Sequence, residues 1–426
     1  MLVGLVSIPL PACAQPDDPP ATPTPLSVLD TIPFDYINHI FVRVTLNDSL
    51  GAVLVYDPVQ GVLLDERFAR RNGLPTFGGE EVGYGGPVTV GGAGSAQHTV
   101  TFARDLTVRD GLPTQPGSTF ERSFPLTPVI PLDSMMAGAL GRPVDGLFGI
   151  DLLAAYVLEF DFEHERFVLH DPGSFAPPPE ASAVPITWME RGRKPAVPVT
   201  LHLTDDEQVD GLFLLDFGMG GALRLTTGFT ETHNLSERIS PTISSDSETG
   251  LGGALQSLFG RIQSVSIGTL RIEQPVLSMA QETEGADAYP EHDGLIGLGL
   301  LDRYRVFYDV PGEQLWLAPT PRAAEPYIYA VTGLRWEAVD RDAAGELIVH
   351  SVAPNSPAAE AGLQPGDQLL AVDDTDASGW TRREWQTMVD QTAAQESGQK
   401  TPVVLDVRIL RSGTVHTVRM SVVRRL

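Results

Sequence analysis

The segments Gly146-Leu147-Phe148-Gly149 and Gly294-Leu295-Ile296-Gly297 decide the fold of this chain. Each is an apolar pair between two glycines, and residue 294 follows residue 146 at a spacing of 148. The same spacing relates three more pairs of identical residues: Tyr156 and Tyr304, Asp161 and Asp309, and Leu169 and Leu317. So many matches at one spacing indicate that the chain contains an internal duplication.

Upstream of each glycine motif, an apolar strand ends abruptly at a carboxylate. Residues 51–56 are followed by Asp57, and residues 211–215 are followed by Asp216. Strands that are apolar along their whole length are typically buried on both faces. Short helices are predicted around residues 65–71 and 300–304. Each half also carries a Gly-x-Gly-Gly element, at residues 83–86 and 250–253, which predicts a Gly-rich hairpin.

Length and composition limit the classes of protein that remain. At roughly 150 residues per domain, 426 residues predict two or three domains. The chain is 42% hydrophobic, which excludes disorder throughout. Its 29 Lys and Arg against 55 Asp and Glu give a net charge of −26, which argues against binding to nucleic acid or to anionic lipid. The sequence contains no apolar run of roughly 18 residues, so no transmembrane helix is predicted.

The content of cysteine and histidine argues against a metal centre. Cys13 is the only cysteine, which rules out a disulfide framework and any cysteine-based zinc site. The nine histidines are scattered and form no ligand motif. We therefore expect no metal and no cofactor.

A buried strand ending in Asp, a short helix, a Gly-rich hairpin and an apolar-apolar-Gly motif together resemble the aspartic proteases, in particular bacterial retropepsin-like proteins that fuse two lobes and append a PDZ domain. The resemblance covers about residues 30–320. It implies a mainly β protein with two pepsin- or retropepsin-like β-barrel lobes, related by a pseudo-two-fold duplication, at residues 28–175 and 176–320. Because the two lobes are fused, we expect a monomer.

The resemblance also implies a reaction and its residues. Asp57 and Asp216 would form a catalytic dyad that shares one proton and activates a water molecule to hydrolyse a peptide bond. Tyr84 and Gly85 would belong to a flap over a polypeptide substrate, and Gly218 would lie beside the carboxylates. The family has a hydroxyl residue after each aspartate, which braces the two loops against each other. This chain has Pro58 and Phe217 at those positions.

Two alternatives follow from those substitutions. Asp57 is equally explained as a strand-end residue that caps a turn, and Tyr84 as a packed aromatic of a hairpin. The first function is an aspartic endopeptidase. The second is a catalytically inactive peptide-binding or scaffold protein that keeps the duplicated cleft.

Residues 327–426 match a PDZ domain. The order of a strand, a Ser356-Pro357 helix start, Gly362, the turn Pro365-Gly366-Asp367 and another strand carries this resemblance. PDZ domains add an extended peptide to a sheet edge and hold its terminal carboxylate with backbone N–H groups. By resemblance, the peptide-binding residues are Thr332, Gly333, Leu334, Arg335 and Trp336, with Trp385 and Val389 lining a side-chain pocket. The partner would be a peptide or protein C-terminus. The alternative is a PDZ-shaped domain without a ligand.

The N-terminus predicts export. Residues 1–14 are apolar and end in the small residues Ala12 and Ala14, and residues 15–27 form a Pro-rich linker that we expect to be disordered. This pattern resembles a signal segment and predicts a periplasmic or secreted protein, with lipid anchoring through Cys13 as one form of it. An unprocessed apolar N-terminus is the alternative.

Overall fold

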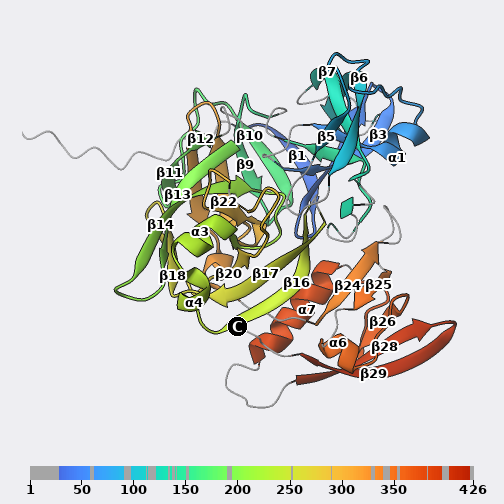
Figure 1. The fold of residues 1–426 in the computed structure, drawn as a ribbon, viewed down its shortest axis with the longest axis vertical. Coiled ribbons are helices and arrows are strands. Elements are labelled where there is room, and N and C mark those ends of the chain that lie inside the picture. Colours follow the sequence, from blue (N-terminus) through green and yellow to red (C-terminus); the bar gives the residue numbers. More distant parts are fainter. Residues whose placement is uncertain are drawn as a thin grey trace, which may run out of the picture.

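The computed structural model describes residues 28–57, 62–90, 97–111, 113, 121–132, 135–136, 140, 142–149, 153–189, 194–250, 253–288, 290–327, 332–338, 346–352, 356–380, 382–395 and 403–422. The predicted signal segment and Pro-rich linker lie outside this part of the chain. The described residues fold mainly as β-strands in three sheets, two of which curl into barrel-like lobes, with the C-terminal β unit beside them (Figure 1).

The first lobe is built from ten strands and one short helix. They are β1 (Val28–Tyr36), β2 (Ile40–Leu46), β3 (Leu50–Tyr56), β4 (Leu63–Asp65), α1 (Glu66–Arg71), β5 (Val88–Val90), β6 (His98–Asp110), β7 (Glu121–Ile130), β8 (Gly146–Phe148), β9 (Val157–Asp161) and β10 (Arg166–His170). Helix α1 begins where expected because Asp65 caps it, accepting hydrogen bonds from the amides of Arg67 and Phe68.

The second lobe repeats this order. Its elements are β11 (Ser182–Pro185), β12 (Thr187–Met189), β13 (Lys194–His202), β14 (Gln208–Asp216), β15 (Leu223–Leu225), α3 (Thr227–Thr232), α4 (Leu235–Arg238), β16 (Thr242–Gly250), β17 (Gly253–Arg261), β18 (Ser264–Ile267), β19 (Leu270–Glu273), β20 (Val276–Ala280), β21 (Gly294–Gly297), α5 (Leu298–Leu301), β22 (Tyr304–Asp309), β23 (Gln314–Pro319) and η2 (Pro321–Ala324). Helix α5 lies earlier than predicted, because Tyr304 already belongs to β22.

The strand connectivity confirms the predicted duplication. Strand β3 runs parallel to β8, and β4 pairs antiparallel with β8 and parallel with β7. In the second lobe β14, β21, β15 and β20 make the same three pairings. Side chains repeat as well: Asp145 accepts a hydrogen bond from the amide of Val53, and Asp293, at the spacing of 148, accepts one from the amide of Leu212.

The two lobes meet through strands that are equivalent in the duplication. Strand β9 pairs antiparallel with β22, so that Phe160 faces Val306 and Leu158 faces Tyr308. Because Leu158 and Val306 are counterparts, and Phe160 and Tyr308 are counterparts, this register is symmetric. It places a local two-fold relation at the middle of the two strands.

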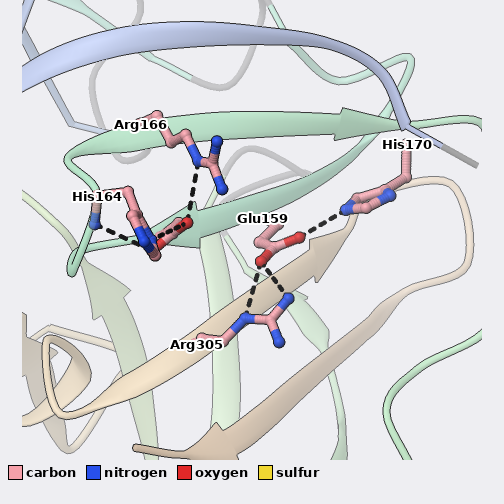
Figure 2. A network of polar contacts seen from close by, with 6 residues as sticks. Glu159, His164, Arg166, His170 and Arg305 are labelled. Carbon is pink, nitrogen blue, oxygen red and sulfur yellow. Dashed lines mark hydrogen bonds and ion pairs between the residues drawn. The ribbon is translucent and has the colours of Figure 1, made fainter. Parts of the chain in front are cut away.

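A buried polar network lies on these interlobe strands (Figure 2). Glu159 of β9 is only 3% exposed, and its carboxylate contacts the Nε2 of His170 at 2.7 Å and the Nε of Arg305 at 2.9 Å. These contacts compensate for the cost of burying the carboxylate. Beside it, Asp161 binds His164 and Arg166 at the end of the same strand.

The C-terminal unit is a separate β-sheet with short helices and its own core. It contains β24 (Leu334–Ala338), β25 (Leu347–Val352), α6 (Pro357–Glu360), β26 (Gln368–Val372), β27 (Thr375–Asp376), α7 (Arg382–Gln395), β28 (Val403–Arg411) and β29 (Thr414–Val422). Ser356 caps α6, as its position before Pro357 predicts. The fully buried Asp367 is held by a two-pronged ion pair with Arg411, with both contacts at 2.6 Å.

Candidate functional site

Asp57 and Asp216 come from equivalent strand ends. The amide of Asp57, directly after β3, donates to the carbonyl of Phe148 in β8 at 2.9 Å. Asp216 is the last residue of β14 and pairs with Gly297 in β21. Each aspartate is therefore fixed against the apolar-apolar-Gly motif of its own half, and this explains why the two motifs recur together.

The structure brings the two carboxylates to one glycine. A Cβ added to Gly218 would lie 2.8 Å from Oδ2 of Asp57 and 3.2 Å from Oδ1 of Asp216, so these two oxygens are no more than 6.0 Å apart. The amide of Gly218 also donates to Oδ1 of Asp216 at 2.9 Å. Gly218 is thus the residue whose missing side chain lets the carboxylates approach.

The pKa of Asp216 is affected by its burial and by the nearby carboxylate of Asp57. Burial raises the pKa of Asp216 well above its ordinary value, and the negative charge of Asp57 raises it further. The charge of Asp287 adds to the rise, whereas the hydrogen bonds from the amides of Gly218 and Met219 act against it. Two carboxyl groups held this close titrate together, because the negative charge of one disfavours ionisation of the other.

Phe217 occupies the position after Asp216 and lies in the interlobe core. Its side chain is fully buried, and its ring stacks on that of Phe160 at a centroid distance of 4.2 Å and an angle of 17°. It also stacks on Tyr308 at 6.4 Å and meets Tyr56 edge-on at 5.8 Å. The residue that the sequence suggested as a lost hydroxyl is therefore an aromatic contact between the halves.

A second buried polar group near Asp216 was not predicted. Arg224 of β15 is 3% exposed and donates to Asp287 at 2.6 Å, to Glu282 at 3.0 Å and to Ser257 at 2.8 Å. Its counterpart on β4 is the apolar Leu63, because both residues pair with the first apolar residue of the glycine motif. A charged residue at an otherwise apolar strand position was the available signal.

Tyr84 and Gly85 lie in a turn rather than on a hairpin. The amide of Tyr84 donates to the carbonyl of Gly79, Gly85 has φ +71°, and the turn precedes β5. By connectivity, the β5–β6 hairpin corresponds to β16–β17, so the predicted equivalence of the two Gly-x-Gly-Gly elements is wrong. Tyr84 is 60% exposed and stacks on Phe102 of β6 at 5.2 Å. A flap role for it stays a prediction.

The predicted peptide-binding residues of the C-terminal unit cluster at the start of β24. Thr332 is buried and accepts a hydrogen bond from the amide of Leu334, and Gly333 has φ +80°. Trp336 is 3% exposed and packs against Trp385 of α7 at 4.9 Å, so this pair lies in the core between strand and helix. Arg335 lies in β24, and its side chain is outside the described part.

Two kinds of site are absent from the part of the chain that the structure describes. The described residues hold no group of three or more His, Cys, Asp or Glu side chains placed to bind a metal ion. Among them there is also no helix that is both long and apolar enough to cross a membrane.

Comparison with known proteins identifies the C-terminal unit. A family model described as PDZ domain matches residues 348–397. Syntenin-2 of Rattus norvegicus is 36% identical over 85 residues, which are 20% of this chain and 26% of that protein. Syntenin-2 of Mus musculus is 34% identical over 85 residues, which are 20% of this chain and 27% of that protein. The chain thus spans about a quarter of the length of the curated relatives it matches.

Solved structures were also compared. The aspartic proteinase from Irpex lacteus aligns with a TM-score of 0.40 and 14% identity, over 70% of this chain and 98% of that one. The Basic 7S globulin from soybean aligns with a TM-score of 0.38 and 9% identity, over 72% of this chain and all of that one. Its own strand pairing makes the chain a mainly β protein with two duplicated barrel-like lobes, and the family model assigns a PDZ domain to residues 348–397.

Proposed function

We propose that this protein is an aspartic peptidase that hydrolyses peptide bonds with Asp57 and Asp216. The observation that carries the proposal is the approach of both carboxylates to Gly218, at 2.8 and 3.2 Å from the position of a Cβ. The ionised carboxylate would take a proton from a water molecule, and the protonated one would hydrogen-bond the oxygen of the scissile carbonyl. The raised pKa of Asp216 supports a proton shared by the pair.

A cleavage assay tests the proposal. Full-length protein and its Asp57→Asn and Asp216→Asn variants are incubated with a fluorescently labelled, unfolded protein between pH 3 and 7. Asp206→Asn, which changes an exposed carboxylate of the same lobe, is the matched control. We expect acid-favoured cleavage that falls more than about 10³-fold in each dyad variant, since neither carboxyl works without the other. Unchanged turnover in Asp216→Asn would eliminate the mechanism.

The same protein samples test the alternative, an inactive scaffold that binds peptide in the duplicated cleft. The replacement of the bracing hydroxyl by Phe217 motivates it. A statine-containing peptide, which mimics the tetrahedral transition state, distinguishes the two functions. A peptidase is inhibited by it, whereas a scaffold binds peptides without cleaving them at any pH.

For the PDZ domain we propose binding of a peptide or protein C-terminus along β24, the end strand of its sheet among the described residues. The edge position of this strand and the left-handed Gly333 at its start support the proposal. Fluorescence anisotropy with pairs of labelled peptides tests it, one member of each pair ending in a carboxylate and the other in an amide. Binding that survives amidation would exclude recognition of the terminal carboxylate.

We also propose that the protein is exported to the periplasm or the medium. This proposal rests on the apolar pattern of residues 1–14.

A further inference from the structure

Phe217 connects the loop of Asp216 to both interlobe strands. Its ring is nearly parallel to Phe160 on β9, at 4.2 Å and 17°, and to Tyr308 on β22, at 6.4 Å and 24°. Phe160 and Tyr308 are counterparts in the duplication, and their strands pair with a symmetric register. The ring of Phe217 therefore contacts the same position of both halves, where the halves meet.

The same ring also reaches the strand of the other aspartate. Tyr56, which directly precedes Asp57, meets Phe217 edge-on at 5.8 Å, and its own ring contacts Phe160 at 5.4 Å. Tyr56, Phe160, Phe217 and Tyr308 are all fully buried. One aromatic cluster thus joins the residue before Asp57 to the residue after Asp216.

Such a cluster resists displacement for a physical reason. A buried ring has few rotamers, and moving it away from its neighbours opens a cavity in a close-packed core. Hydroxyls would brace the two loops by hydrogen bonds, whereas the ring of Phe217 contacts its neighbours by packing. In this protein, aromatic packing therefore connects the two loops that hydroxyl groups would connect by hydrogen bonds.

We propose that Phe217 is the positioning residue of the dyad: its stacking on Phe160 sets the separation of the Asp57 and Asp216 carboxylates. The proposal rests on the proposed function only for its catalytic consequence, because the separation of the carboxylates is a property of the folded protein. Two carboxyl groups held close titrate in two steps, and the gap between the steps grows as they approach. Weakening the stacking of Phe217 on Phe160 should therefore bring the two apparent pKa values of the aspartate pair closer together.

The test is an NMR titration of the full chain labelled with ¹³C at aspartate side chains, with the pair assigned from Asp57→Asn and Asp216→Asn. Phe217→Leu removes the ring and keeps an apolar side chain. Phe213→Leu is the matched control, because Phe213 is a fully buried ring on β14, the strand that Phe217 follows, and its ring contact with Phe229 lies within the second lobe. Thermal unfolding of both variants measures the general cost of losing a ring.

We expect the upper apparent pKa of the pair to fall by at least about one pH unit, a tenfold loss of proton affinity, in Phe217→Leu and to stay unchanged in Phe213→Leu. Phe160→Leu should reproduce the fall, and the double variant should add little to it, since both changes break one contact. Phe160→Leu also serves if Phe217→Leu does not fold.

An equal titration in the wild type, Phe217→Leu and Phe160→Leu would overturn the proposal, whatever their stability. In cleavage assays the proposal predicts a fall of at least tenfold in kcat with little change in KM for Phe217→Leu. A wild-type protein that shows two-step titration but no cleavage would contradict the peptidase proposal and leave the positioning role standing.

Discussion

Glu159 and Phe307 face each other at the centre of the β9–β22 pair, and each is the counterpart of the other in the duplication. The local two-fold relation therefore passes between two unlike residues. Phe160, the next residue of β9, belongs to the aromatic cluster around Phe217, whereas Glu159 is held by His170 of β10 and Arg305 of β22 (Figure 2). The halves have diverged at their shared centre while they kept their strand register.

This divergence leads to a prediction about stability. Arg305→Met removes one partner of Glu159, which is 3% exposed, and leaves its carboxylate with His170 alone. Removing a partner of this buried carboxylate should cost about 2 kcal/mol in the free energy of unfolding, less than for a fully buried pair because the side chain of Arg305 is 40% exposed. Arg271→Met breaks the exposed pair with Glu273 and should cost less than about 1 kcal/mol. Urea unfolding at pH 7 measures both, and equal losses would show that the Glu159 network adds no stability.

Asp216 should lower the stability of its own lobe at neutral pH. Burial and the charge of Asp57 raise its pKa, so the folded state binds a proton more tightly than the unfolded state. Stability is then greatest below the unfolded pKa and falls as the pH rises through the folded pKa. Asp216→Asn should be more stable than the wild type at pH 7, and this advantage should shrink at pH 4. Calorimetry at both pH values checks this.

Asp206→Asn provides the comparison for that experiment, because Asp206 is exposed in the same lobe. It should change the unfolding temperature little at either pH. If Asp216→Asn were no more stable than the wild type at pH 7, the two carboxylates would not repel each other measurably. The result would then argue against a proton shared between them.

Gly218 offers a direct test of the geometry of the site. In Gly218→Ala the new Cβ would lie 2.8 Å from Oδ2 of Asp57, a distance that forces the carboxylates to shift. Misplacement of reacting groups by about 1 Å costs on the order of 10²-fold in rate, and we expect a loss of that size in kcat/KM. In Gly86→Ala the new Cβ has nothing within 4 Å and should leave cleavage unchanged. Similar activities in both variants would mean that Gly218 has no role in the approach of the carboxylates.

The duplication could be predicted from the sequence because it repeats residue types at one spacing. The glycine motifs, Asp57 and Asp216 all occupy equivalent strand ends, as their sequence positions indicated. Asp145 and Asp293 carry the same signal, since each precedes the first glycine of its motif, but their hydrogen bonds to neighbouring strands had no local signature.

Other features depend on contacts across the fold and left little trace in the sequence. Similar composition suggested that Gly83–Gly86 matches Gly250–Gly253, but strand pairing assigns them to different structures. In the sequence alone, Phe217 indicates only that the hydroxyl residue of the family is replaced. Its contacts with Phe160 and Tyr308 depend on the positions of β9 and β22 in the fold. The burial of Trp336 likewise depends on helix α7, which lies about fifty residues further along.

Asp390 on helix α7 gives a final prediction, at the junction of the PDZ domain and the second lobe. Burial raises its pKa to about 6, and the hydrogen bond from Gln386 and then the positive charge of Arg303 in the second lobe oppose that rise. Arg303 stacks on the ring of Tyr327 at 3.7 Å and donates to the carbonyls of Glu325 and Pro326, so it holds the chain that leads into the PDZ domain.

Because the folded pKa of Asp390 is higher than the ordinary value, its protonated form stabilises the fold, and that stability is lost as the pH rises from about 4 to about 6. Asp390→Asn should therefore raise the unfolding free energy of the PDZ domain by about 1–2 kcal/mol at pH 7 and change it little at pH 4. Asp374→Asn, at an exposed carboxylate of the same domain, should change the unfolding free energy little at either pH. Calorimetry of the full chain at pH 4, 5, 6 and 7 follows the transition, and an Asp390→Asn variant whose advantage over the wild type does not grow between pH 4 and 7 would contradict the raised pKa of Asp390.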